Sequence, residues 1–335
     1  MNGTAIAPRR WRVPAPAPAA LIDWPEDFTP RFTIFVDTEE DFDWAAPFAR
    51  ENWSLASLAA LPAAHRRFAD RGVPLTFLAD YPVVSDARAI DLLRAIMADG
   101  RSTIGAQLHP WVNPPHEELL SPAASFAGNL PRALEAAKID RLTDAITAGF
   151  GAPPLVYRAG RYGIGPDTFA LLAARGYRID TSMRAGFRYC DEGGPDFTAI
   201  DSRAWRHGTL IELPLTTVFT GALRRAGAGL YDRLGAIPRG RGMFARAGLL
   251  SRVPLTPEGV PVAEALEAIR VALGEGARVL NFAFHSPSLV TGNTPYVRDA
   301  ADLARLWSWW DRVLDLLDRR GVTSATPADL LRAIG

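Results

Sequence analysis

Short apolar runs alternate with longer segments of helical periodicity along most of the chain. The first run, FTIFV, begins at residue 32 and matches a strand that is buried on both faces. Similar runs follow, each separated from the next by a segment with leucines or alanines at helical spacing. The pattern predicts strands at 32–37, 73–84, 102–109, 155–160, 177–182, 209–219 and 278–287.

The segments between these runs carry the signals of helix boundaries. Gly72 and Gly100 stand where a glycine ends a helix, and Pro166 stands in a first turn. The predicted helices are 54–72, 86–100, 130–148, 166–175, 262–273 and 299–319, followed by a short strand and a last helix. Because strands and helices alternate without a repeat period, we predict one parallel, barrel-like α/β domain.

Two stretches depart from this alternation. Residues 183–205 lose the pattern, which predicts an irregular loop. Residues 222–254 are rich in arginine and glycine, which predicts loosely packed helices that cover an opening.

The charge and the cysteine content exclude several classes of function. The 335 residues include 37 basic and 37 acidic side chains, so the chain has no net charge that would favour nucleic acid or an anionic membrane. Cys190 is the only cysteine, which excludes an intramolecular disulfide and a thiolate metal cluster. A neutral or weakly charged partner is therefore expected.

The N-terminal stretch is expected to form an arm. Arg9, Arg10 and Arg12 precede a proline-rich stretch that is too short and too broken for the apolar core of a signal peptide. Nowhere do eighteen apolar residues follow one another, so no transmembrane helix is predicted. We expect an extended arm over 1–28, a barrel domain over 29–335, and a cytoplasmic location.

The first strand ends in five acidic residues, namely Asp37, Glu39, Glu40, Asp41 and Asp43. Carboxylates this close repel one another unless a cation or several hydrogen-bond donors lie among them, as in metal and acid–base sites. A solvated acidic loop that caps the next helix is the other interpretation.

The other strands also end in polar residues, and in a parallel barrel these strand ends form the active site. Gln107 and His109 end the third strand, Arg158 the fourth, Asp180 the fifth and His285 the seventh. Because side chains alternate along a strand, Gln107 and His109 are expected to share one face, as are Asp37 and Glu39. Several such residues at the same depth are hard to explain by packing alone.

Six motifs in this order make the chain resemble the polysaccharide deacetylases of the NodB-homology type, and most closely a bacterial subgroup called WalW-like. The resemblance covers about residues 30–330. Its motifs are VDTEEDFDW, VPLTFLADY, IGAQLHPWVNPP, YRAGRYG, DTSM and NFAFHSPSL.

The resemblance implies a distorted (β/α)7 barrel that removes N-acetyl groups from amino sugars with one divalent metal, usually zinc. It implies that Asp37 is the general base, that Arg158 orients it, and that His285 is the general acid, which we place across the opening from Asp37. The substrate would be a carbohydrate or amino sugar, with contacts expected from Trp111, Tyr162 and Asp180.

The chain departs from the family pattern at the metal. Thr38 stands where the family has an acidic ligand, and Gln107 stands where it has its first metal histidine. We therefore expect Glu39, His109 and Gln107 to hold the metal, an oxygen-rich set that binds zinc less tightly and suits a harder cation. His116 and His207 are expected to be solvated loop residues, and the alternative is that they join the site. A pseudoenzyme that binds carbohydrate without turnover is the alternative function.

Overall fold

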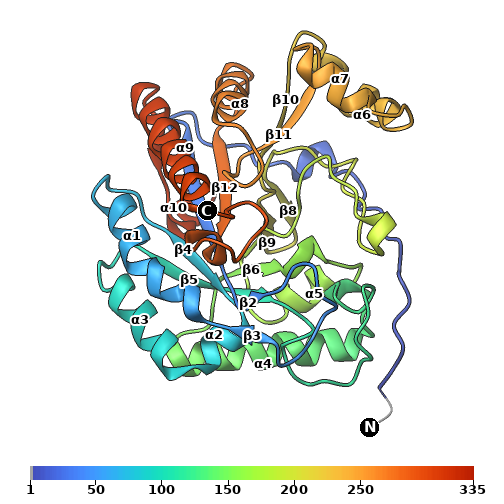
Figure 1. Cartoon of the computed structure of the whole chain (residues 1–335), viewed down its shortest axis with the longest axis vertical. Coiled ribbons are helices and arrows are strands. Elements are labelled where there is room, and N and C mark those ends of the chain that lie inside the picture. Colours follow the sequence, from blue (N-terminus) through green and yellow to red (C-terminus); the bar gives the residue numbers. More distant parts are fainter. Residues whose placement is uncertain (1–2) are drawn as a thin grey trace.

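The computed structural model describes residues 3–335, which form a curled, mostly parallel sheet with helices around it (Figure 1). Seven of its parallel strands follow one another in a continuous ladder, namely β1 (Arg31–Thr38), β4 (Thr76–Ala79), β5 (Thr103–Leu108), β6 (Val156–Ala159), β7 (Ile179–Asp180), β9 (Leu210–Glu212) and β12 (Val279–His285). They lie in the order β12-β1-β4-β5-β6-β7-β9. Antiparallel β8 (Trp205–His207) extends one edge, and β13 (Thr323–Ser324) pairs with the start of β1. The predicted distorted (β/α)7 barrel is confirmed.

Side-chain and loop hydrogen bonds connect β12 to the segment after β9 in place of a strand ladder. The Asn281 side-chain amide donates to the carbonyl oxygens of Leu213 and Pro214, at 2.9 and 3.1 Å, and to the Thr181 hydroxyl at 2.9 Å. The backbone nitrogen of Thr216 donates to the carbonyl oxygen of Asn281 at 3.2 Å. The barrel is therefore closed by a buried polar residue at its incomplete side.

The helices pack on the outside of the sheet (Figure 1). They are α1 (Leu61–Ala69), α2 (Tyr81–Ser85), α3 (Ala87–Met97), α4 (Arg132–Phe150), α5 (Thr168–Ala173), α8 (Val262–Gly274), α9 (Ala300–Arg319) and α10 (Pro327–Ala333). On α9, Trp310 packs against Phe282 and Phe284 of β12 and against Phe68 of α1. Trp310 is buried, so this contact forms part of the outer core.

Inside the sheet, Phe35, Leu78, Val156, Ile179 and Ile211 belong to a second apolar cluster. Side chains alternate along each strand, so the residue two positions after Phe35 points to the same side. That residue is Asp37. The interior therefore has an apolar floor, and its polar residues lie at the carboxyl ends of the strands.

The predicted strand at 73–84 is wrong in its second half. β4 ends at Ala79, and α2 begins at Tyr81. Asp80 caps this helix by accepting a hydrogen bond from the backbone nitrogen of Val83 at 3.0 Å, and Pro82 stands in the first turn. The apolar run at 73–84 therefore contains a short helix after the strand.

The predicted strand at 209–219 is also wrong, because it divides into two strands in different sheets. β9 ends at Glu212, Pro214 follows, and β10 (Thr217–Thr220) pairs antiparallel with β11 (Ser251–Pro254) outside the barrel sheet. The predicted helix at 54–72 starts late, since α1 begins at Leu61 after a 3₁₀ turn over Ala56–Ala60.

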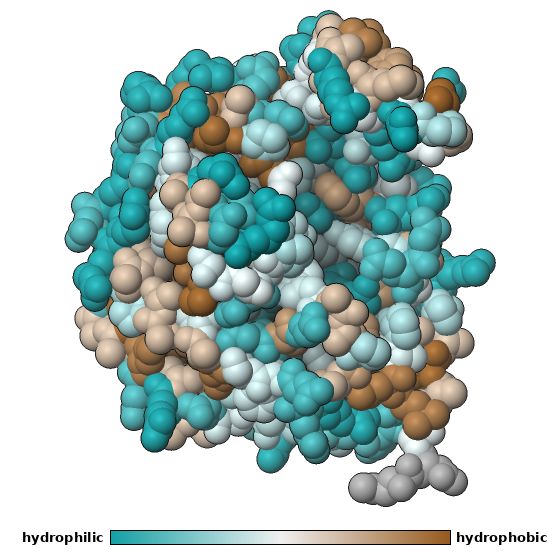
Figure 2. Space-filling model, in the orientation of Figure 1, coloured by the Kyte–Doolittle hydropathy of each residue, from teal (hydrophilic) through white to brown (hydrophobic). Residues whose placement is uncertain are grey.

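Two helices form within 222–254, as predicted, and β11 follows them without having been predicted. They are α6 (Gly227–Gly235) and α7 (Gly240–Arg246). Ile237 and Met243 expose 51% and 53% of their surface here. Figure 2 accordingly shows hydrophobic beside hydrophilic residues at the top of the view, over α6 and α7.

Residues 3–28 run in an extended conformation along the barrel, with one 3₁₀ turn over Pro18–Ala20. Thr4 pairs with Glu118, Arg12 with Asp196 and Leu21 with Trp205 through isolated backbone bridges. Val13 is fully buried, so this segment contributes to the core. Over residues 3–335, no helix has the length and apolar character needed to cross a membrane.

Candidate active site

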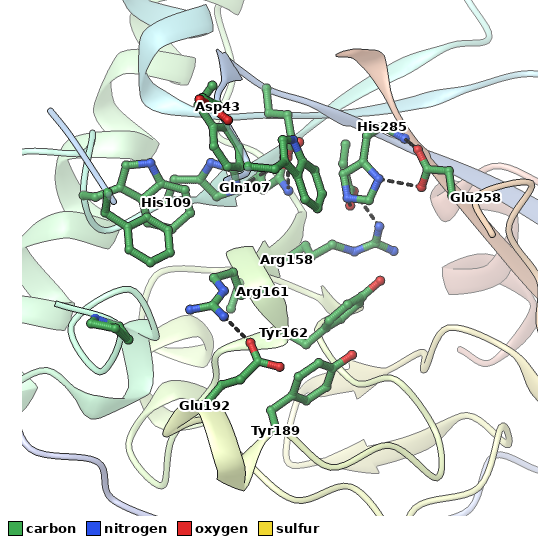
Figure 3. A pocket seen from close by; sticks show the side chains of 18 of the residues that line it. Asp43, Gln107, His109, Arg158, Arg161, Tyr162, Tyr189, Glu192, Glu258 and His285 are labelled. Atoms are coloured by element: carbon green, nitrogen blue, oxygen red, sulfur yellow. Dashed lines mark hydrogen bonds and ion pairs between the residues drawn. The ribbon is translucent and has the colours of Figure 1, made fainter. Parts of the chain in front are cut away.

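A cavity of about 720 Å³ opens at the carboxyl ends of the parallel strands (Figure 3). Eight of the nine predicted site residues line it, namely Asp37, Glu39, Gln107, His109, Trp111, Arg158, Tyr162 and His285. They come from β1, β5, β6 and β12 and from the turns that follow these strands. The polar residues that the sequence places at the ends of separate strands therefore line one cavity.

Asp37 and Arg158 form a buried ion pair at the base of the cavity. Arg158 Nη1 donates to Asp37 Oδ1 at 2.5 Å, and its Nε donates to the carbonyl oxygen of Thr181 at 3.0 Å. The guanidinium also lies over the Phe35 ring, 5.5 Å from its centroid. Because both side chains are buried, Arg158 fixes the direction of the Asp37 carboxylate.

His285 is the β12 residue that pairs with Asp37 of β1, so the two lie on adjacent strands. Our expectation that His285 lies across the opening from Asp37 is therefore wrong. His285 Nε2 is 3.4 Å from Asp37 Oδ2, and Nδ1 is 2.6 Å from Glu258 Oε2. Burial alone would lower the pKa of His285, but the carboxylates of Glu258, Glu39 and Asp37 outweigh it and raise the pKa to about 10.

Glu258 was not predicted from the sequence. It lies in the loop between β11 and α8, where no periodic pattern marks it. Its carboxylate accepts hydrogen bonds from the backbone nitrogen of His285 at 3.1 Å and from the Ser288 hydroxyl at 2.5 Å. Burial would raise the pKa of Glu258, but the charge and hydrogen bonds of His285 keep it below its usual value. Glu258 therefore holds the His285 ring in place as a carboxylate.

Glu39, Gln107 and His109 meet on the other side of Asp37. Gln107 Nε2 donates to Glu39 Oε2 at 3.1 Å, and His109 Nε2 is 3.4 Å from the same oxygen. Burial raises the pKa of Glu39 to about 7. Gln107 Oε1 is buried and has no hydrogen-bond partner within residues 3–335.

Gly160 leaves space beside this group. A Cβ atom on Gly160 would lie 2.2 Å from His109 Cδ2 and 2.8 Å from its Nε2, distances that no real contact allows. Any other residue would therefore displace the His109 ring. The next two residues, Arg161 and Tyr162, adopt left-handed backbone angles, with φ of 54° and 59°. This strained turn follows β6 directly, and both side chains line the cavity.

Glu40 and Asp80 lie behind His109, away from the cavity. His109 Nδ1 is 2.8 Å from Glu40 Oε2, and the Trp111 indole donates to Glu40 Oε1 at 2.9 Å. Asp80 Oδ2 accepts from the backbone nitrogen of Glu40 at 2.9 Å. Burial raises the pKa of Glu40 to about 8 and the pKa of Asp80 well above its usual value. A proton on His109 Nδ1 that is donated to Glu40 leaves Nε2 as the nitrogen that faces Glu39.

Two sets of atoms around His109 could hold a metal ion. Glu40, Asp80 and His109 bring three donor atoms within 4.8 Å of one another, but Glu40 and Asp80 do not line the cavity. On the cavity side, Glu39 offers a carboxylate, His109 a nitrogen and Gln107 an unpartnered amide oxygen. Glu39 Oε2 and His109 Nε2 face each other at 3.4 Å, and two hydrogen-bond acceptors in this position need a proton or a cation between them. These residues therefore fit a divalent cation.

Aromatic rings surround the mouth of the cavity. Trp111 stacks on His109, with 4.3 Å between ring centroids, and lies 4.8 Å from Phe48. Trp44 is 40% exposed. Tyr162 stacks on Tyr189 at 5.6 Å (Figure 3). Trp44, Phe48 and Tyr189 also line the cavity but were not predicted, because isolated aromatic residues in loops carry no pattern.

Asp180 does not line the cavity, although it ends a strand. It is fully buried, it accepts a hydrogen bond from the Ser182 hydroxyl, and it pairs across the β7–β9 ladder with Glu212. Burial raises the pKa of both carboxyl groups. His116 and His207 are exposed and also lie outside the cavity lining, and His207 ends strand β8 instead of lying in the predicted loop.

Comparisons with known proteins give matches at the level of structure. No protein-family model and no curated protein matches the sequence. A probable polysaccharide deacetylase from Pseudomonas aeruginosa PAO1 matches with a TM-score of 0.50 and 15% identity, over 90% of each chain. A Mycobacterium smegmatis protein assigned to the polysaccharide deacetylases matches with a TM-score of 0.47 and 17% identity, over 92% of this chain and 97% of that one.

A branching enzyme of the GH57 type from Thermococcus kodakaraensis also matches, with a TM-score of 0.49 and 12% identity, over 90% of this chain and 71% of that one. At these identities a match concerns the fold and leaves the chemistry open. The chain thus shares its fold with polysaccharide deacetylases.

Proposed function

We propose that the protein is a metal-dependent hydrolase that removes an N-acyl group, most simply N-acetyl, from an amino sugar or polysaccharide. The proposal rests on one observation: the Asp37 carboxylate lies between Arg158 and the His285 imidazole at the base of the cavity. A base and an acid side by side are what amide hydrolysis needs. The motifs that resemble the WalW-like deacetylases support the same assignment, as does the aromatic rim, which suits the apolar faces of sugar rings.

Each residue has a distinct task in this reaction. Asp37 takes a proton from the attacking water, and Arg158 keeps its carboxylate in position. His285, held by Glu258 and protonated at neutral pH because its pKa is about 10, donates its Nε2 proton to the leaving nitrogen. Without that proton the sugar would leave as a poor, basic amide anion. Both proton transfers therefore take place at neighbouring strand ends.

Glu39, His109 and Gln107 would hold the metal on the cavity side. When bound, a divalent cation supplies Lewis acidity that polarises the amide carbonyl and acidifies water. Glu40 orients the His109 ring from behind, and Gly160 leaves the ring the room that it needs.

The test is release of acetate from N-acetylated amino sugars in the presence of added zinc, manganese or iron, with Asp37→Asn as the comparison. The change is isosteric, so we expect loss of turnover with an unchanged circular dichroism spectrum. Wild-type turnover in Asp37→Asn would show that Asp37 is not the base.

A sugar-binding protein without turnover is the second candidate, and the observation that favours it is Gln107. An amide oxygen is a weaker zinc ligand than the imidazole of the family pattern. Metal content separates the two functions. Close to one equivalent of metal in the purified protein supports the hydrolase, and a protein that stays metal-free after loading supports the binding protein.

A further inference from the structure

Arg184 lines the cavity on the side of the tyrosines, and its charge is not neutralised there. The two other cavity arginines are paired, Arg158 with Asp37 and Arg161 with Glu192. Within residues 3–335, by contrast, the Arg184 guanidinium has no carboxylate partner, and its buried Nε has no hydrogen-bond partner. A guanidinium carries five N–H groups, so most of its binding capacity is unused.

A second arginine increases the positive charge at this place. Arg184 and Arg252 both lie against the Phe187 ring, with guanidinium carbons 3.9 and 3.5 Å from its centroid. Arg252 donates one hydrogen bond, to the carbonyl oxygen of Gly186 at 2.6 Å, and has no carboxylate partner among the described residues. Two like charges that share one ring repel each other unless an anion lies nearby.

Neutral hydrogen-bonding groups accompany Arg184. The Tyr162 ring lies 5.7 Å from its guanidinium carbon. The Tyr189 hydroxyl is buried beside the same guanidinium: burial raises the pKa of this phenol, and the charge and hydrogen bonding of Arg184 lower it. A guanidinium beside phenol hydroxyls is a suitable donor set for the oxygens of a carboxylate or a phosphate.

We propose that the sugar bound in this cavity carries an anionic group, a carboxylate or a phosphate, and that Arg184 binds it. This inference rests on the proposed function and specifies its substrate class. Tyr162, whose ring lies 5.7 Å from the Arg184 guanidinium carbon, lines the same cavity as Arg158 and Asp37. The proposal places the acyl group of the sugar at Asp37 and its anionic group at the Arg184 guanidinium, within one cavity.

Binding of sugars that have no acyl group tests the inference separately from catalysis. The probes are glucose 1-phosphate, glucuronic acid and glucose, measured by isothermal titration calorimetry. We expect at least one of the two anionic sugars to bind the wild-type protein about tenfold or more tightly than glucose, the gain of a charge-assisted contact. The comparison between phosphate and carboxylate identifies which of the two groups the site prefers.

Arg184→Gln should abolish this preference. The matched control is Arg188→Gln, which removes the same charge from the same loop at a position that is exposed and outside the cavity. The control should keep the preference for the anionic sugar. Equal binding of all three probes to the wild type, no binding of any probe, or equal losses in both variants would each overturn the inference.

A second measurement compares kcat/KM for N-acetylglucosamine 1-phosphate, N-acetylmuramic acid and N-acetylglucosamine with added metal. Arg184-dependent binding of the anionic probes without any turnover would contradict the proposed hydrolase but keep the anion site. Turnover of all three substrates at equal kcat/KM would support the hydrolase and contradict the anion site.

Discussion

His285 holds one ring nitrogen on Glu258 and directs the other towards Asp37, 3.4 Å away. If it is the general acid, His285→Ala should lower turnover of an N-acetyl amide by about 10²–10⁴-fold, the range for removal of an acid or base. An activated acetyl ester has a leaving group that needs no proton, so its hydrolysis should fall far less. The comparison of kcat on the two substrates checks this. Equal losses would assign His285 a role in binding instead.

Among the three residues that would hold the metal, Gln107 offers the weakest ligand atom for zinc. Its amide donates to Glu39 and leaves Oε1 without a partner. Gln107→His should raise the affinity for zinc, because it offers a second imidazole beside His109 on the same face of the strand end. Competition with a chromogenic chelator measures this affinity, with Gln107→Leu as the control that removes the amide. An unchanged affinity in Gln107→His would mean that position 107 does not face the metal.

The residues that could be predicted from the sequence share one property, which is that they lie at the end of a strand or in the turn directly after it. Asp37, Arg158 and His285 each follow an apolar run, so their place at the cavity follows from the barrel geometry. Glu258 and Arg184 lie in irregular loops, where no period fixes the direction of a side chain. Asp180 shows the limit of the rule, since it ends a strand but pairs with Glu212 in the interior.

At the scale of elements, α4 holds the loop that carries Trp111. Lys138 of α4 is fully buried, and its Nζ donates to the carbonyl oxygens of Pro110, Asn113 and Pro115 at 2.9, 2.6 and 2.8 Å. It also lies 3.2 Å from Glu118 Oε1. The ammonium group of Lys138 therefore holds the loop between His109 and Glu118 in place through hydrogen bonds.

Lys138→Met should destabilise the protein by about 3–5 kcal/mol, because it removes the nearer cation from the buried Glu118 carboxylate and leaves only Arg50, at 3.9 Å. Urea unfolding measures this change. Adding Glu118→Gln should recover part of the loss, since the uncompensated charge is then removed. If the single and the double variant are equally unstable, the lost carbonyl contacts, not the ion pair, account for the effect.

Long strands and helices could be predicted, whereas short strands could not be delimited. β1 and β12 are long apolar runs and were found in place. β7 and β9 have two and three residues, which is too short for any alternation to appear. Asp80 and Pro214 interrupt apolar segments whose pattern predicts continuous strands, and each is a single polar or imino residue that changes the path of the backbone.

At the scale of the whole molecule, buried carboxyl groups make the stability depend on pH. Asp180 and Glu212 are fully buried, and burial raises the pKa of both above the values of 3.8 and 4.5 that such groups ordinarily have. A carboxyl group whose pKa is raised by folding stabilises the folded state fully at pH values below its unfolded pKa. That contribution is lost as the pH rises towards the folded pKa.

Glu212→Gln should therefore reduce the loss of stability between pH 5 and pH 8. The amide keeps the size of the side chain and can still hydrogen-bond Asp180, but it cannot ionise. Because the raised pKa of Glu212 makes the folded state resist its ionisation, we expect the unfolding free energy of the variant to fall less than that of the wild type over this range. Urea unfolding at both pH values measures it, with Glu51→Gln, an exposed loop position, as the control that should follow the wild type. If Glu212→Gln loses as much stability as the wild type, Glu212 is already ionised in the folded protein, and the positive charge of Arg158, not a proton, stabilises the buried pair.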